Sequence, residues 1–110
     1  DEAAIALLPQ GSYLVNTARG SVVNTSSVVS ALENGKLAGA ALDVLPMEPP
    51  DDRDPLLLAW RDPGHPAHDR LILNPHGAWY CEEGLLDARA KACLNARRVL
   101  LGERPHNVVN

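Results

Sequence analysis

The stretch that decides the fold is Tyr13-Leu14-Val15-Asn16-Thr17-Ala18-Arg19-Gly20. Its apolar start, Tyr13–Val15, predicts a short buried strand, and its polar half places Arg19 just beyond the end of that strand. In an open α/β sheet, ligands collect at the carboxyl ends of the strands. We therefore expect the Arg19 guanidinium to face a crevice, where it could bind a carboxylate.

Two further strands are predicted downstream, and polar residues stand at the end of each. Gly39–Val44 is an apolar run that contains Asp43, and Leu71–Leu73 stops at Asn74-Pro75, just before His76. The carboxyl ends of neighbouring parallel strands lie on one edge of a sheet. We therefore expect these polar side chains to face the same crevice as Arg19.

Helix signals lie around and between the strands. Asp1–Leu8 resembles the last turns of a helix, and Asn24 can cap a second helix that ends at Asn34-Gly35. The proline-rich segment from Leu45 to Arg70 excludes a long regular element but leaves room for one helical turn at Leu56–Trp60. Glu82–Leu101 predicts a long helix with an apolar stripe. Strand, helix and strand with short connections indicate an α/β fold.

Composition limits the classes of function. The chain of 110 residues has 45% hydrophobic residues and no Phe, which suits one closely packed α/β domain. Its net charge of −4 argues against a nucleic-acid surface, and no apolar run is long enough to span a membrane. Cys81 and Cys93 stand alone, which is typical of free thiols in a reducing compartment, so we expect a cytoplasmic protein.

Arg19, Glu48 and His76 together suggest an anion clamp with a paired proton donor. Taken singly, the polar residues after the strands have structural explanations: Arg19 as a surface residue, Asp43 as a turn former and His76 as a capping side chain. Their placement after successive strands favours a functional site. His65 and His68, by contrast, lie in the proline-rich loop with no third ligand indicated, so we predict no metal site.

A family resemblance rests on these same segments. Leu8–Val23 resembles the arginine signature of the D-isomer-specific 2-hydroxyacid dehydrogenases, and Gly39–Val44, Glu48-Pro49 and Asn74-Pro75-His76 continue the order of that family. Ala78-Trp79-Tyr80 is similar to the C-terminal-binding-protein branch, whose members act as nicotinamide-sensitive corepressors in animals.

The resemblance implies an architecture, a cofactor and a substrate class. Residues 1–77 would be the second half of a Rossmann-type parallel-sheet domain that binds NAD, and residues 78–110 would be a long interdomain helix with a terminal tail. The substrate would be a small 2-keto or 2-hydroxy acid, and the full-length form would be a homodimer. The alternative is a dinucleotide-sensing, corepressor-like module that binds protein partners and catalyses little.

The resemblance also implies a role for each site residue. Arg19 would bind the substrate carboxylate, His76 would be the general acid and base, and Glu48 would hydrogen-bond the other ring nitrogen of His76. Trp79 would line the substrate pocket with Arg19. An equally good interpretation is that Trp79 anchors the long helix by packing into the core. The residues expected to contact the cofactor are Thr17, Ala18, Arg19, Asp43, His76 and Gly77.

One expected part of a dinucleotide site does not occur in the sequence. The pyrophosphate needs a Gly-rich turn at a helix N-terminus, with an acidic residue about twenty positions further on for the ribose. The glycines of this chain are scattered singly. We therefore expect the chain to be a fragment that is inactive by itself. The choice between NAD and NADP and the identity of the acid stay open.

Overall fold

The structure, a computed structural model, describes residues 1–109, and its contacts divide the chain into two compact units. The first unit is Asp1–Gly77 and contains a sheet with its helices. The second begins at Ala78 and contains one long helix, α4 (Glu82–Leu100). The assignment of α4 as an interdomain helix stays a prediction.

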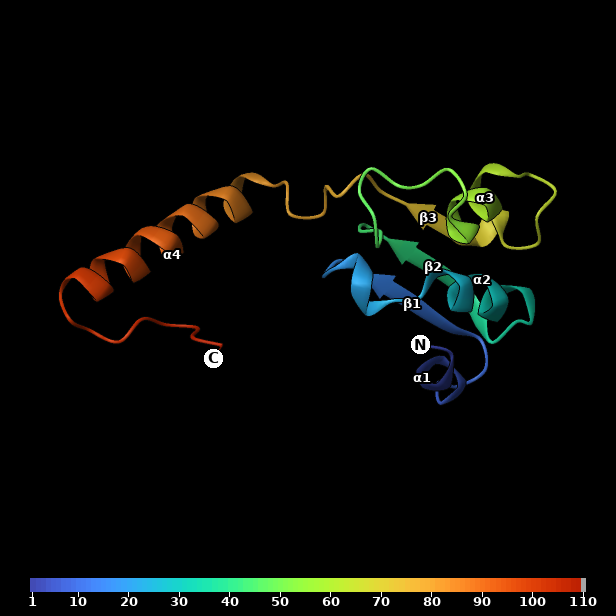
Figure 1. The fold of residues 1–110 in the computed structure, drawn as a ribbon, viewed down its shortest axis with the longest axis horizontal. Helices are drawn as coiled ribbons and strands as arrows, with labels where there is room; N and C mark the ends of the chain where they lie inside the picture. Colours follow the sequence, from blue (N-terminus) through green and yellow to red (C-terminus); the bar gives the residue numbers. More distant parts are fainter. Residues whose placement is uncertain (110) are drawn as a thin grey trace. The chain divides into compact units, whose positions relative to one another are not determined.

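The first unit is built on a three-stranded parallel sheet, which confirms the α/β fold class (Figure 1). Its strands are β1 (Ser12–Asn16), β2 (Leu37–Leu42) and β3 (Leu71–Leu73), with β2 in the middle. Strand β2 starts and ends two residues earlier than the predicted Gly39–Val44. The register accounts for its end, because Leu42 pairs with the last residue of each neighbouring strand.

Capping side chains set the starts of the helices. The predicted cap of α2 (Thr25–Glu33) is confirmed, because the Asn24 side chain accepts a hydrogen bond from the Ser27 amide. The helix α1 (Glu2–Ala6) is shorter than expected and ends before Leu7, which is 88% exposed.

The proline-rich segment contains more helix than the single turn expected from it. The helix α3 spans Pro55–Arg61, and the Asp54 side chain caps it by accepting from the Leu56 and Leu57 amides. Pro55 occupies the first helical position, where a missing N–H costs nothing. The Thr25 hydroxyl also donates to the Asp54 carboxylate at 3.2 Å, so the starts of α2 and α3 are tied together.

The hydrophobic core lies on one face of the sheet, where α2 contacts β2 and α3 contacts β3. The prediction that β1 and β3 are buried strands is wrong for their alternate residues: Tyr13 is 78%, Val15 71% and Ile72 67% exposed. Successive strand residues point to opposite faces, and the contacting helices cover only one face of this sheet. The side chains that fill the core are Val28, Leu32, Leu37, Leu42 and Leu56.

Helix α4 has no buried residue. Its predicted apolar stripe includes Leu86, Val99 and Leu100, all of which are exposed. Acidic residues stand in its first turn and arginines in its last, as the helix dipole favours, and Gly102 follows in the left-handed conformation with φ +72°. No helix within residues 1–109 is both long and apolar enough to cross a membrane.

Candidate functional site

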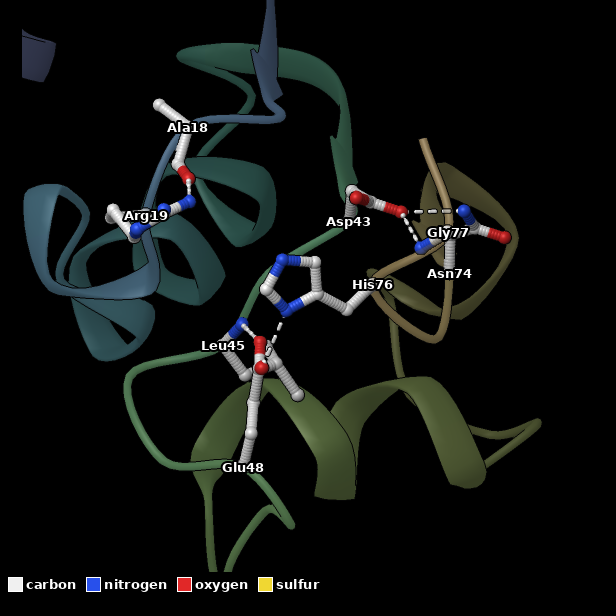
Figure 2. A network of polar contacts seen from close by, with 8 residues as sticks. All are labelled: Ala18, Arg19, Asp43, Leu45, Glu48, Asn74, His76 and Gly77. Atoms are coloured by element: carbon white, nitrogen blue, oxygen red, sulfur yellow. Dashed lines mark hydrogen bonds and ion pairs between the residues drawn. The ribbon is translucent and has the colours of Figure 1, made fainter. Parts of the chain in front are cut away.

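Three loops meet at the carboxyl end of the sheet, one after each strand. Residues from these loops line a single depression, which we call the strand-end hollow. The structure thus brings Arg19, Glu48 and His76 to one place, as the sequence predicts (Figure 2). The lining residues are Arg19, Gly20, Ser21, Val44, Leu45, Pro46, Glu48 and His76.

Glu48 and His76 form the closest polar pair of the hollow. Glu48 Oε2 lies 2.6 Å from His76 Nδ1, and Glu48 Oε1 accepts from the Leu45 amide at 3.0 Å. These two hydrogen bonds, His76 first, lower the pKa of Glu48 below its usual value. An ionised carboxylate only accepts, so Nδ1 carries the shared hydrogen and Nε2 is directed away from Glu48 (Figure 2).

The backbone of His76 adopts a conformation that few residues other than glycine adopt. Its φ is +54°, in the left-handed region. The His76 amide donates to the Asp43 carbonyl at 2.9 Å and to the Asn74 carbonyl at 3.0 Å. These bonds hold the turn that aims the imidazole at Glu48. An unfavourable backbone conformation maintained by specific contacts is typical of functional sites.

Asp43 ties that turn to the end of β2. Its side chain is buried, and its Oδ1 accepts from the Asn74 side-chain amide at 2.5 Å and from the Gly77 amide at 2.8 Å. A buried carboxylate requires such donors, because desolvation penalises the charged form. Asp43 therefore has a structural task here, and its predicted contact with the nicotinamide stays a prediction, as does that of Gly77.

Arg19 is arranged differently. Its side chain is exposed, and its Nη1 donates to the neighbouring Ala18 carbonyl at 2.7 Å (Figure 2). Within residues 1–109 the guanidinium takes part in no ion pair. A guanidinium at the rim of a hollow with no carboxylate against it can receive an anionic ligand.

Asn16 supports the arginine loop and was not singled out from the sequence. It is 4% exposed at the end of β1, where its Nδ2 donates to the Arg19 carbonyl at 3.0 Å and its Oδ1 accepts from the Ala18 amide at 3.1 Å. Asn74, which was also not singled out, supports the turn after β3: its side-chain amide donates to Asp43 and its carbonyl accepts from the His76 amide. The available signal was an amide side chain at the point where a strand ends.

The remaining predicted residues lie at the edges of this arrangement. Thr17 and Ala18 are exposed in the loop after β1, next to Arg19. Trp79 belongs to the second unit, where its ring meets that of Tyr80 edge to face with centroids 5.4 Å apart. The roles of all three at the cofactor or the substrate stay predictions.

The two histidines of the proline-rich segment have structural partners. His65 lies 3.3 Å from the Glu33 carboxylate and accepts from the Ala67 amide, and His68 Nδ1 lies 2.6 Å from the Trp60 carbonyl. In the described part of the chain, no three His, Cys, Asp or Glu side chains are grouped so that they could hold a metal ion.

Known proteins are similar to this chain in both sequence and fold. Residues 1–78 match the family model described as D-isomer specific 2-hydroxyacid dehydrogenase, NAD binding domain. The D-specific alpha-keto acid dehydrogenase of Enterococcus faecium is 42% identical over 101 residues, which cover 83% of this chain and 30% of that protein.

Solved structures agree with the sequence comparisons. The D-isomer specific 2-hydroxyacid dehydrogenase of Xanthobacter autotrophicus Py2, in complex with NADPH and MES, matches with a TM-score of 0.75 and 31% identity, over 100% of this chain and 41% of that one. A D-lactate dehydrogenase of Treponema pallidum matches with a TM-score of 0.66 and 32% identity, over 100% and 34%. This chain spans less than half the length of these relatives. It belongs to the family of NAD-binding domains of D-isomer specific 2-hydroxyacid dehydrogenases.

Proposed function

We propose that this chain is the NAD-binding part of an oxidoreductase that interconverts a 2-keto acid and a D-2-hydroxy acid. The observation that carries the proposal is the Glu48–His76 contact of 2.6 Å in the same hollow as Arg19. A proton donor and an anion-binding cation beside one another are what the reduction of a keto acid requires of its protein.

The residues present fit one end of the cofactor. The carboxamide of a nicotinamide ring needs hydrogen-bond acceptors and donors, and the strand ends offer the Ala18 carbonyl and the Asp43 carboxylate with its partner amides. The pyrophosphate end has no Gly-rich turn within the 110 residues. When bound, NADH supplies the hydride that reduces the keto carbon.

Arg19 would bind the substrate. A guanidinium presents paired N–H donors in a fork that matches a carboxylate, so it holds the acid in a defined orientation. To bind the acid, Arg19 has to give up only its hydrogen bond to the neutral carbonyl of Ala18. A positive charge beside the keto group also stabilises the negative charge that develops on the keto oxygen.

His76 would supply the proton. Its Nδ1–H donates to Glu48, so Nε2 is the nitrogen that exchanges a proton with the substrate oxygen. In reduction, the keto carbon gains a hydride and its oxygen takes the proton from Nε2, which leaves a hydroxyl group and neutral imidazole. Oxidation reverses both transfers. The Glu48 carboxylate accepts the Nδ1 hydrogen and so orients the ring for the transfer.

The corepressor alternative rests on Ala78-Trp79-Tyr80 alone. The relatives compared above are dehydrogenases by name, and the pair of Glu48 and His76 gives proton transfer a structural basis that a sensing module does not need. We therefore favour the enzyme. Homodimer formation and a cytoplasmic location remain part of the proposal for the whole protein; the two cysteines, both free thiols, are consistent with a reducing compartment.

The test is a reduction assay on the whole protein. We expect consumption of NADH or NADPH with one or more small 2-keto acids and formation of the D-hydroxy acid, identified by chiral chromatography. A panel that varies the side chain of the acid would define the substrate, and the two cofactors measured in parallel would define the dinucleotide. Tight NADH binding with no turnover on any 2-keto acid would refute the proposal and favour a sensing role.

A further inference from the structure

Gly20 lies where two loops of the site cross. It is buried directly after Arg19, and a Cβ placed on it would lie 2.0 Å from both the carbonyl carbon and the oxygen of Leu45 and 2.4 Å from the nitrogen of Pro46. All of these are backbone atoms, so no side-chain rotation could relieve the overlap. Only a glycine lets the loop after β2 pass this close to the loop after β1.

The requirement is one of contact and not of backbone conformation. Gly11, Gly35 and Gly102 have positive φ angles, which explains glycine at those positions, and Gly20 does not. An alanine at position 20 would therefore meet no conformational penalty of its own. To restore ordinary van der Waals distance, the backbone of Leu45 and Pro46 would have to move by more than about 1 Å.

The segment that would move carries the acid of the site. The Leu45 amide donates to Glu48 Oε1 at 3.0 Å, and the other oxygen of the same carboxylate contacts His76 at 2.6 Å. Glu48 is thus attached on one side to the backbone that crosses Gly20 and on the other side to the imidazole. The turn that carries His76 is held separately, through Asp43 and Asn74.

We propose that Gly20 is a positioning residue: the close crossing over it sets the place of Glu48, and through Glu48 the orientation and tautomer of the His76 imidazole. The inference rests on the proposed function for its importance in catalysis. Its structural part, the dependence of the Glu48–His76 contact on residue 20, holds or fails independently of any activity.

The first experiment is ¹⁵N NMR of the histidine rings in the 110-residue chain. In the wild type, the bond to Glu48 should keep the hydrogen of neutral His76 on Nδ1. In Gly20→Ala, we expect the His76 ring nitrogens to shift toward a mixture of tautomers. Glu48→Gln provides the reference spectrum for the altered pair. Gly64→Ala is the matched control, because a Cβ there would meet only the Asp62 carboxylate, at 3.3 Å.

Each outcome decides the proposal. A folded Gly20→Ala chain with the wild-type His76 signals would overturn it. Loss of the fold in Gly20→Ala, with Gly64→Ala folded, would also overturn it, because the crossing would then hold the domain and not specifically the pair. In the wild type, a nuclear Overhauser contact between Gly20 Hα and Pro46 Hδ is expected, and its absence would show that the loops do not cross there.

The second experiment uses the whole protein. Gly20→Ala should lower kcat about 10²-fold, the order expected when a reacting group is displaced by 1 Å, while the dissociation constant for NADH stays close to wild type. Unchanged kcat beside altered His76 signals would overturn the catalytic part of the proposal. If the wild-type protein reduces no 2-keto acid, the proposed function fails, and the NMR experiment still decides whether Gly20 positions the pair.

Discussion

The two halves of the candidate site differ in how complete they are. His76 contacts Glu48 at 2.6 Å, and the hydrogen bonds that Asp43 accepts from Asn74, His76 and Gly77 fix the turn behind it. Arg19 has a fixed backbone, held by Asn16, but its guanidinium rests on the carbonyl of the preceding residue. The proton-transfer half thus contains a side-chain pair, whereas the guanidinium of the anion-binding half donates to a neutral backbone carbonyl.

This difference has a physical reason. The carboxylate of Glu48 is a permanent partner for His76, so the pair can form during folding. In the proposed role, Arg19 leaves its charge available to the substrate, and a permanent carboxylate partner would compete with that ligand. We therefore expect substitutions in the first half to change the chemical step and substitutions in the second to change binding.

The largest effect is expected for His76→Gln in the whole protein. Glutamine cannot exchange a proton at neutral pH. The single-turnover rate of 2-keto acid reduction should therefore fall 10²- to 10⁴-fold, which is the usual contribution of general acid catalysis to the rate. The affinity for NADH, measured by the change in nicotinamide fluorescence, should stay nearly unchanged. A variant that turns over at the wild-type rate would remove His76 from the mechanism.

Arg19→Gln should have the next largest effect, on binding. Loss of a charge-assisted hydrogen bond corresponds to about 1.5–3 kcal/mol. The dissociation constant for a 2-keto acid or a carboxylate inhibitor should therefore rise roughly 10- to 150-fold. Arg19→Lys should recover part of the affinity, because it keeps the charge but not the fork. Equal affinities in wild type and Arg19→Gln would show that the acid binds elsewhere.

A smaller effect is expected on acid stability in Glu48→Gln. The pKa of Glu48 is lower in the folded chain than its ordinary value of 4.5, so the pair stabilises the fold above that pH. The contribution is lost as the pH falls through the lower folded-state pKa. Urea unfolding from neutral to acidic pH should therefore show a greater loss of stability in the wild type than in Glu48→Gln.

Another acidic group, Asp51, also has a lowered pKa, and its effect on acid stability must be separated from that of Glu48. The ion pair with Arg53 lowers the pKa of Asp51, but this pair is present in both chains and cancels in the comparison. Asp51→Asn in the wild-type background measures its share directly. Parallel stability profiles for wild type and Glu48→Gln would contradict a folded-state role for the Glu48–His76 pair.

The smallest signal is expected from the 110-residue chain mixed with NADH. It contains the residues proposed to contact the nicotinamide but no Gly-rich turn for the pyrophosphate, which provides much of the affinity for a dinucleotide. Titration followed by nicotinamide fluorescence should give no measurable binding and no turnover. Micromolar binding by this chain would show that the main cofactor contacts lie elsewhere in it.

The sequence predicted the main residues of the site because each stands in a recognisable local context. Arg19 and His76 follow apolar runs, and Glu48 lies between prolines in the connecting loop. Asn16 was missed although its partners, Ala18 and Arg19, are local. Asn74 and Gly20 were missed because their partners are distant in the sequence. Asn74 bonds to a carboxylate 31 positions away, and the need for glycine at position 20 arises only when a distant backbone crosses it.

The fold shows the same limit. The order of strands and helices followed from apolar runs and caps, but the exposed face of β1 and β3 did not, because alternation of three to five residues does not reveal which faces are covered. In α3, Pro55 looked like an interruption from the sequence. In the structure, the Asp54 side chain caps a helix that begins at Pro55.

The central claim is that His76 performs proton transfer and Arg19 binds the acid, and the most direct test measures both variants in one steady-state assay. In the whole protein, kcat and KM for the same 2-keto acid would be determined for wild type, His76→Gln and Arg19→Gln. We predict that the largest loss in kcat appears in His76→Gln, with KM close to wild type, and that Arg19→Gln raises KM with a smaller loss in kcat. A His76→Gln variant that raises KM and keeps the wild-type kcat would contradict the account.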